Sequence, residues 1–250
     1  RPIPLLKDLI KQKTTVVTGG NTYENFANLA PAFIEQIISK YEGTRLGRQE
    51  LYAEILDDVE GALWTRQMLD DLRVLKHPDL KRIVVAVDPE ATSTEGSAET
   101  GIVVVGLGVD DHGYLLDDLS LRDTPDRWGR AVVTALNMHG ADRVVAEANQ
   151  GGEMVEHVLR TIMPNIPYKA VHASRSKVAR AEPIAALTEQ GRIHHVGMFG
   201  PLEDQLCGWV VGEKSPDRLD AYVWGFTELM VEQAAPTRTA PPTILSARTR

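Results

Sequence analysis

A short apolar run that ends in a carboxylate limits the possible folds of this chain more than any other feature. Residues 83–87 are Ile-Val-Val-Ala-Val, and Asp88 and Pro89 follow directly. The run is too short for a buried helix and rich in valine, so it predicts a strand that is covered on both faces. Packing gives no reason for an acid at the end of such a strand. We therefore expect Asp88 to be functional and other acids to converge on it.

From residue 83 onward the sequence predicts three strands in succession and then strands that alternate with helices. Residues 91–100 form a polar turn, and residues 101–107 and 114–119 complete a three-stranded meander. The later predicted elements are a helix over 125–138, a strand over 143–147, a helix ending near 162, a strand over 166–171, and helices over 174–190, 201–211 and 217 to about 232. Residues 191–196 are expected to be extended. This order predicts an α/β protein with a mixed five-stranded sheet and helices on both faces, the ribonuclease H-like fold.

The composition says more about the cellular compartment of the protein than about the reaction it catalyses. The 250 residues are 43% hydrophobic, which is enough for a real core, and the net charge of -8 is weak evidence against nucleic acid, since a basic groove can coexist with it. The single Cys207 cannot form an internal disulfide, and no apolar run approaches the roughly 20 residues of a membrane span. We expect a cytosolic protein without membrane contact. The opening Arg1-Pro2 also suggests a piece of a longer chain.

Two further acids are placed to join Asp88. Glu147 ends the strand over 143–147, which should lie beside the first strand, and Asp220 falls in the first turn of the last helix. Asp217, three residues earlier, is on the same side of that helix and is equally suited to cap it. Acids at strand ends and helix starts are common, so one alone means little. Together they suit two Mg²⁺ or Mn²⁺ ions, which would support phosphodiester hydrolysis.

Basic residues between positions 169 and 192 form the best candidate surface for DNA. They outnumber the two acids of this stretch and comprise Lys169, Arg175, Lys177, Arg180 and Arg192. For each one alone, a solvated helix face is the simpler explanation. Gly151 and Gly152, after Glu147, would let a phosphate approach a helix N-terminus, although paired glycines are also ordinary in such a turn.

The regions before and after the predicted sheet are expected to contain only isolated elements and a tail. Residues 2–13 predict a short helix, residues 14–18 a strand and residues 25–41 a helix, without a sheet of their own. A connecting helix is predicted over residues 61–76, with the main domain boundary near 78. Residues 233–250 contain several prolines and predict a flexible tail.

Six motifs, in order and spacing, resemble the large subunit of tailed-phage terminases. Two of them, Val16-Val-Thr-Gly-Gly-Asn-Thr-Tyr-Glu-Asn25 with Asn28-Leu-Ala-Pro31 and Tyr41-Glu-Gly-Thr-Arg-Leu-Gly-Arg-Gln-Glu-Leu51, resemble the end of its ATPase domain. The others resemble its nuclease domain and are Val87-Asp88-Pro89, Ala146-Glu147-Ala-Asn-Gln-Gly-Gly152, Lys177-Val-Ala-Arg-Ala181 and Ser215-Pro-Asp-Arg-Leu-Asp-Ala221. The likeness covers nearly all of residues 2–232.

The resemblance implies a metal-dependent endonuclease that cuts concatemeric double-stranded viral DNA during genome packaging in the host cytoplasm. It implies a partial ATPase remnant over residues 1–60, a linker over 61–78, a nuclease domain over 79–232 and a tail over 233–250. The implied partners are DNA, the terminase small subunit and the portal protein. Asp88, Glu147 and Asp220 would bind metal, with Asp217 nearby, and Lys177 would lie close to them. The chain contains no Gly-x-x-x-x-Gly-Lys-Ser/Thr loop, so we expect no ATP hydrolysis.

Two other functions remain open at this level. One is a DNA-binding or docking module whose acids hold no metal, which a plasmid-cleavage assay would separate from a nuclease. The other is a junction resolvase or transposase-type enzyme on the same fold. Residues 14–51 argue against the latter, since such enzymes need no ATPase segment.

Overall fold

A computed structural model describes residues 9–10, 12, 14–16, 18–32, 51–52, 59–89, 99–148, 152–173 and 176–231. Most of the helix predicted over 25–41 and all of the tail predicted over 233–250 lie outside these ranges. The prediction of a strand over residues 14–18 is wrong for the residues that are described, because residues 14–16 and 18 are not in a strand. A β-branched run needs a neighbouring strand for its hydrogen bonds, and no described strand pairs with this one. The 3₁₀ helix η1 (Thr22–Asn28) follows it.

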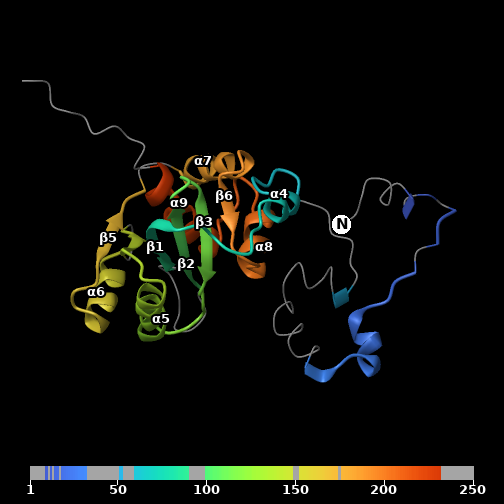
Figure 1. The fold of residues 1–250 in the computed structure, drawn as a ribbon, viewed down its shortest axis with the longest axis horizontal. Helices are drawn as coiled ribbons and strands as arrows, with labels where there is room; N and C mark the ends of the chain where they lie inside the picture. Colours follow the sequence, from blue (N-terminus) through green and yellow to red (C-terminus); the bar gives the residue numbers. More distant parts are fainter. Residues whose placement is uncertain are drawn as a thin grey trace, which may run out of the picture.

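A six-stranded mixed sheet organises the rest of the described chain (Figure 1). Its order is β5-β4-β1-β2-β3-β6, and its strands are β1 (Leu80–Pro89), β2 (Thr100–Gly108), β3 (Gly113–Asp118), β4 (Arg143–Glu147), β5 (Tyr168–Val171) and β6 (Ile193–His195). Strands β1, β2 and β3 form the antiparallel meander, while β4 runs parallel to β1, and β5 parallel to β4. The prediction of a ribonuclease H-like α/β sheet is confirmed.

The sheet has one strand more than predicted. The extended stretch after helix α7 (Lys177–Glu189) supplies β6, which pairs in parallel with β3. A strand of three residues has too few side chains to show a period, and its partner is distant in the sequence. Only the tertiary fold therefore distinguishes β6 from an extended loop.

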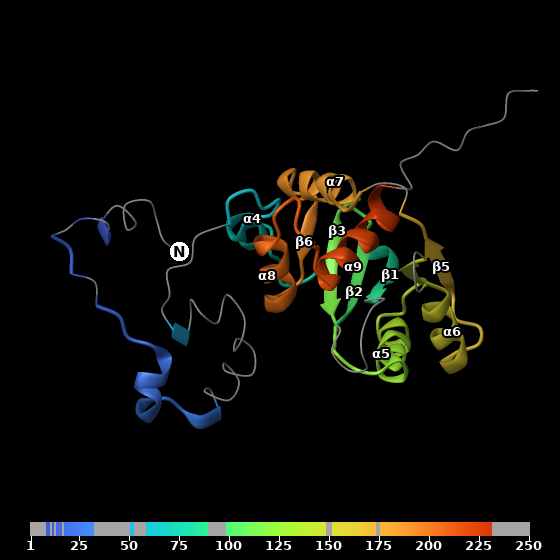
Figure 2. The same cartoon turned by 180° about the vertical axis from the view of Figure 1, so that it is seen from behind.

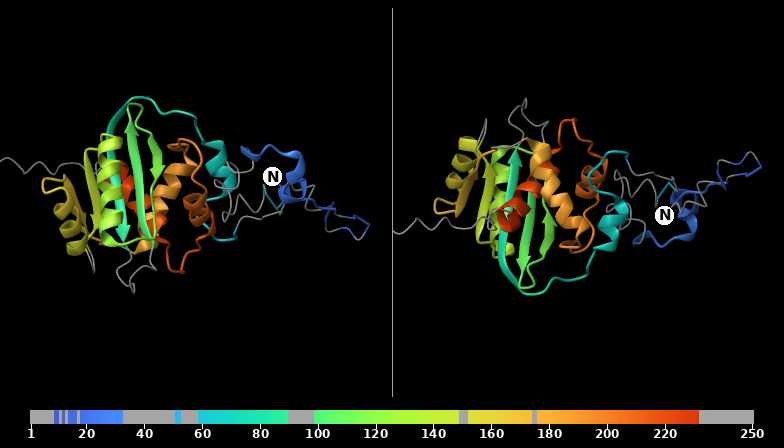
Figure 3. Two further views of the ribbon diagram at one scale, coloured as in Figure 1. Left: turned by 90° about the horizontal axis from the view of Figure 1, so that it is seen from below. Right: turned by 90° about the horizontal axis from the view of Figure 1, so that it is seen from above.

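Helices cover both faces of the sheet, as predicted. Val85 and Val87 of β1 pack with α5 (Pro125–Met138) and α6 (Gly152–Ile162) on one face. Val84 and Ala86 pack on the opposite face, whose helices are α7 (Lys177–Glu189), α8 (Gly200–Gly208), α9 (Asp217–Phe226) and the π-helical turn η2 (Thr227–Val231). Figure 2 shows the fold from behind, and the two panels of Figure 3 show the sheet from its two opposite sides. Burial on both faces is why β1 is a continuous apolar run.

Helix α9 lies unusually close to the sheet, at two glycines. A Cβ atom on Gly101 of β2 would come within 2.1 Å of the carbonyl oxygen of Asp217, the first residue of α9. A Cβ atom on Gly225 would come within 2.7 Å of a methyl group of Val105. Both distances are shorter than atoms can approach, so the small residues set the depth at which α9 sits on β2.

Residues 59–78 pack onto the sheet domain. The helix predicted over 61–76 is short, α4 (Arg66–Asp71), and the side chain of Thr65 caps it by accepting from the backbone N–H of Met68. Trp64 is fully buried and donates from Nε1 to Oγ1 of Thr188 at 3.2 Å. Val74 forms an isolated parallel β-bridge with Val196, which follows β6 directly. This segment is therefore part of the same hydrophobic core as α7 and α8.

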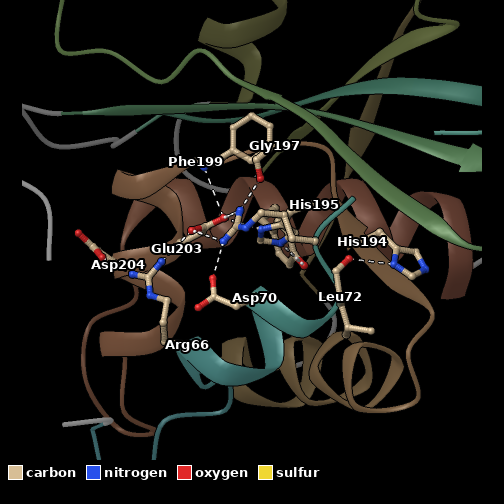
Figure 4. A network of polar contacts seen from close by, with 11 residues as sticks. Arg66, Asp70, Leu72, His194, His195, Gly197, Phe199, Glu203 and Asp204 are labelled. Carbon is tan, nitrogen blue, oxygen red and sulfur yellow. Dashed lines mark hydrogen bonds and ion pairs between the residues drawn. The ribbon is translucent and has the colours of Figure 1, made fainter. Parts of the chain in front are cut away.

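A buried carboxylate fastens the segment in place (Figure 4). Glu203 of α8 is fully buried and forms ion pairs with Arg66 at 2.7 Å and with Arg73 at 2.6 Å, while its third partner, His195 of β6, lies at 3.0 Å. Burial opposes ionisation of Glu203, but the hydrogen bonds with His195 and Arg73 outweigh it and lower its pKa to about 2.

Candidate functional site

Three elements bring the predicted acids to one end of the sheet. Strands β1 and β4 are parallel neighbours with Val87 opposite Ala146, so Asp88 and Glu147 follow side by side. Both side chains point to the face covered by α9, because side chains alternate along a strand and Val84, Ala86 and Val145 also lie there. The first turn of α9 carries Asp217 and Asp220 to the same place.

The charge of Asp88 is held in an unfavourable environment. Burial, the negative charge of Asp220 and, more weakly, the charges of Glu147 and Asp217 raise the pKa of Asp88 well above its ordinary value, and Lys177 only partly offsets them. The other three acids thus repel the charge of Asp88. Such a cluster is stabilised by added positive charge.

Asp220 is buried and already paired. Its Oδ2 atom accepts hydrogen bonds from Nζ of Lys177, the first residue of α7, and from the hydroxyl of Ser215. The N-cap residue of α9 is Pro216, without a side-chain cap bond, so neither Asp217 nor Ser215 caps this helix. The Ser215 hydroxyl orients the carboxylate of Asp220 instead.

Glu147 is fixed by a stacked pair of side chains. Nη1 of Arg180 lies 3.2 Å from Oε2 of Glu147, and Nε1 of Trp224 donates to the same oxygen at 2.9 Å. The guanidinium carbon of Arg180 lies 4.2 Å from the centre of the Trp224 ring. Only 8% of the Arg180 side chain is exposed, and its Nε atom has no hydrogen-bond partner among the described residues. Helices α7 and α9 thereby hold the carboxylate at the end of β4.

A second cation anchors the start of α9. Arg218 forms ion pairs with Glu99, just before β2, at 2.8 Å and with Asp118, at the end of β3, at 2.6 Å. Burial opposes the charge of Arg218, yet these carboxylates raise its pKa, and Arg218 in turn lowers the pKa of Glu99. The helix turn that carries Asp217 and Asp220 is therefore tied to the meander as well as packed against it.

The four acids suit hard divalent cations by their chemistry, since all are carboxylates. Within the described ranges, however, no group of three or more His, Cys, Asp or Glu side chains is arranged to hold a metal ion. Asp220 and Glu147 are instead turned toward Lys177 and Arg180.

The structure brings most of the predicted site residues together. Asp88, Glu147, Asp217, Asp220 and Lys177 share one end of the sheet, with Arg180 in contact with Glu147. The predicted phosphate-binding residue Gly152 begins α6, whereas Gly151 and Arg175 lie outside the described residues. The assignment of Lys177, Arg180 and Gly152 to DNA stays a prediction.

Three side chains of the site were missed from the sequence. Trp224 follows Asp220 by four residues, so helical spacing was a usable signal for it. Arg218 and Ser215 gave none, because their roles depend on Glu99 and on the side-chain rotamer of Asp220. The two histidines of β6 have other partners: His195 binds Glu203, and His194 stacks on Tyr114.

No curated protein matches this chain. Among solved structures, the large terminase nuclease of the thermophilic phage G20c is 14% identical, with a TM-score of 0.50 over 67% of this chain and 98% of that chain. The large terminase of a second thermophilic bacteriophage is 15% identical, with a TM-score of 0.51 over 84% of this chain, which spans about half (54%) of that one. At such identities, the two structures support the shared fold. Among the described helices, none is long and apolar enough to cross a membrane.

A family model described as the terminase RNase H-like domain matches residues 85–229, which is more than half of the chain. The matched segment begins inside β1 and ends within η2, so it contains all four acids and the helices that position them. The chain therefore belongs to the terminase RNase H-like domain family.

Proposed function

We propose that this protein is a metal-dependent endonuclease that cuts concatemeric double-stranded viral DNA during genome packaging. The carrying observation is the convergence of Asp88, Glu147, Asp217 and Asp220 from three elements, where mutual repulsion and burial raise the pKa of Asp88. Family membership supports the same conclusion. The proposed partners are the terminase small subunit and the capsid portal, and the segment before residue 60 is proposed as a remnant of an ATPase domain without activity of its own.

Asp88, Glu147 and Asp220 would hold two Mg²⁺ or Mn²⁺ ions, with Asp217 close by. When bound, the ions supply an activated water and stabilise the charge that leaves with the departing oxygen. Arg180 and Trp224 would hold Glu147 in the orientation needed for this. Lys177 pairs with Asp220 in the structure, so a bound cation would take over that charge neutralisation. The side chain of Lys177 is 46% exposed and would then be able to turn to a DNA phosphate.

One observation favours the competing function, a DNA-binding module without metal. Glu147 and Asp220 each already have a cationic partner in Arg180 and Lys177, and the described acids are not arranged as a metal site. A protein of this kind would bind DNA equally well with and without divalent ions.

Cleavage of supercoiled plasmid with Mn²⁺, Mg²⁺ or EDTA separates the two functions. We expect nicking with either metal, none in EDTA, and none from Asp88→Asn, which keeps the shape of the side chain but removes a charged ligand. The matched control is Asp126→Asn on α5, an exposed acid on the other face of the sheet. Equal cleavage by the wild type and Asp88→Asn would contradict the proposed site, and metal-independent cleavage would contradict the mechanism. A preference for branched over linear duplex would favour a resolvase.

A further inference from the structure

A lysine side chain supplies positive charge to two of the acids in this structure. Lys177 begins α7, which lies next to α9 on the same face of the sheet (Figures 1 and 2). Its Nζ atom donates to Oδ2 of Asp220, which also accepts from the hydroxyl of Ser215. The charge of Lys177 acts on Asp88 as well, where it partly offsets the charges of the other acids. Lys177 is therefore a counter-ion that the chain itself provides to Asp220 and Asp88.

The two members of the Lys177–Asp220 ion pair differ in their exposure to solvent. The side chain of Asp220 is 4% exposed and is held by Ser215, whereas that of Lys177 is 46% exposed. Lys177 also lies in the first turn of a helix, where the helix dipole stabilises anions and disfavours a cation. The ion pair therefore keeps Lys177 at the site, and the ammonium group is the member that is able to leave.

A cation in this position opposes the binding of another cation. A divalent ion at Asp88 and Asp220 would be repelled by Lys177 and would compete with it for carboxylate oxygen atoms. The affinity of the acids for metal is therefore lowered while Lys177 stays on Asp220. Phosphate oxygens of a duplex form strong charge-assisted hydrogen bonds with lysine. A phosphate that takes Lys177 away from Asp220 therefore raises the affinity of the acids for metal.

We propose that Lys177 couples metal binding to DNA binding, because its pairing with Asp220 weakens the metal site until a duplex phosphate takes the lysine. This inference rests on the proposed function and concerns the regulation of the same site. The coupling is reciprocal, since two ligands that affect each other's affinity do so by the same factor. Bound metal frees Lys177 for DNA, and bound DNA frees Asp220 for metal. The nuclease is thereby completed at a duplex and stays weakly loaded elsewhere.

The first test is Mn²⁺ binding by the full chain without DNA, measured by the loss of the electron paramagnetic resonance signal of free Mn²⁺. Lys177→Gln removes the competing charge and should bind Mn²⁺ about tenfold more tightly than the wild type. The matched control is Lys81→Gln, because Lys81 also pairs with an aspartate, has a 41% exposed side chain and lies at the other end of β1. This control should bind Mn²⁺ as the wild type does. Equal or weaker Mn²⁺ binding by Lys177→Gln would overturn the proposal.

The second test is duplex affinity, measured by fluorescence anisotropy in EDTA and in Ca²⁺ at equal ionic strength. Ca²⁺ binds the same kind of carboxylate oxygen, and a denaturing gel verifies that the duplex stays intact. The metal should tighten duplex binding by the wild type and by Lys81→Gln by a factor about ten times larger than for Lys177→Gln. The same factor in all three proteins would overturn the coupling through Lys177.

These measurements distinguish coupling from a merely structural ion pair. A pair that only fastens α7 to α9 would lower the melting temperature of Lys177→Gln and leave its Mn²⁺ affinity unchanged, which would overturn the proposal. If Lys177→Gln fails to fold, Lys177→Met, which keeps the aliphatic stem, decides by the same Mn²⁺ titration.

The outcomes also separate this inference from the proposed function. Tighter Mn²⁺ binding by Lys177→Gln, together with no plasmid cleavage by the wild type, would contradict the nuclease function and support the role of Lys177. Mn²⁺-dependent cleavage by the wild type, together with an unchanged Mn²⁺ affinity in the variant, would do the reverse.

Discussion

At the scale of single residues, Asp88 combines a functional position with a cost in stability. Its charge is buried and repelled by Asp220, Glu147 and Asp217. A side chain of the same shape without the charge should therefore relieve strain in the folded state.

We predict that Asp88→Asn melts at a higher temperature than the wild type at neutral pH in EDTA. Relief of about 1 kcal/mol corresponds to about 2–4 °C for a chain of this size. Added Mg²⁺ or Mn²⁺ should then stabilise the wild type, since ligands that bind the folded state raise its stability, but have little effect on the variant. Thermal unfolding by circular dichroism measures both. A lower melting temperature for Asp88→Asn would show that its charge is not repelled in the fold.

Gly101 is the residue on which the geometry of the site most depends. It is the cross-strand partner of Asp88, and it touches the backbone of Asp217. Its missing side chain therefore sets the distance between the acid of β1 and the acids of α9.

We predict that Gly101→Ala lowers the rate of metal-dependent cleavage by on the order of 100-fold, because α9 must shift by about 1 Å or more. The overpacking should also cost about 1–3 kcal/mol of stability. Gly208→Ala, at the end of α8, is the control, since a Cβ atom there meets nothing within 4 Å. Wild-type cleavage by Gly101→Ala would mean that the acids tolerate a displaced α9.

At the scale of elements, the segment predicted as a connecting helix packs into the core of the sheet domain. Trp64 and Leu69 belong to the core on the α9 face, and Trp64 stacks edge-on against Tyr222 of α9. The segment before β1 is thus a structural part of the domain that carries the site.

We predict that a protein beginning at residue 59 folds as the full chain does, whereas one beginning at residue 79 is severely destabilised. Trp64→Ala alone should cost about 3–5 kcal/mol, as large core truncations do. Urea unfolding followed by tryptophan fluorescence compares the full chain, the two shortened proteins and Trp64→Ala. An equally stable protein starting at residue 79 would support the domain boundary predicted near residue 78.

At the scale of the whole molecule, the ionised Glu203 couples stability to pH. Its folded pKa of about 2 lies below the ordinary value of 4.5, so its contribution is fully present above about pH 4.5 and is lost as the pH falls toward 2. A shift of this size corresponds to on the order of 3 kcal/mol.

We predict that Glu203→Gln destabilises the protein strongly near neutral pH, because Arg66, Arg73 and His195 lose their buried partner. The difference in free energy of unfolding between the wild type and the variant should shrink as the pH is lowered from about 5 to about 2. Denaturant titrations at several pH values measure it. Parallel pH profiles for the two proteins would show that Glu203 is not the group that titrates.

The sequence by itself determined the order of elements, the two-sided burial of β1 and the acids at the ends of β1 and β4. These follow from local information: apolar periodicity, the turn residues between elements and the topology that such an order permits. Asp220 could be located for the same reason, as a first-turn acid of a helix whose start is marked by Ser215 and Pro216.

Tertiary structure alone decided how those acids are held. The pairing of Glu147 with Arg180 and Trp224, of Asp220 with Lys177, and the passage of α9 over Gly101 depend on contacts between residues far apart in the chain. The same holds for β6 and for the docking of Trp64. Such contacts leave no period in the sequence, because each is made once, between side chains whose distance is fixed only when the whole sheet has assembled.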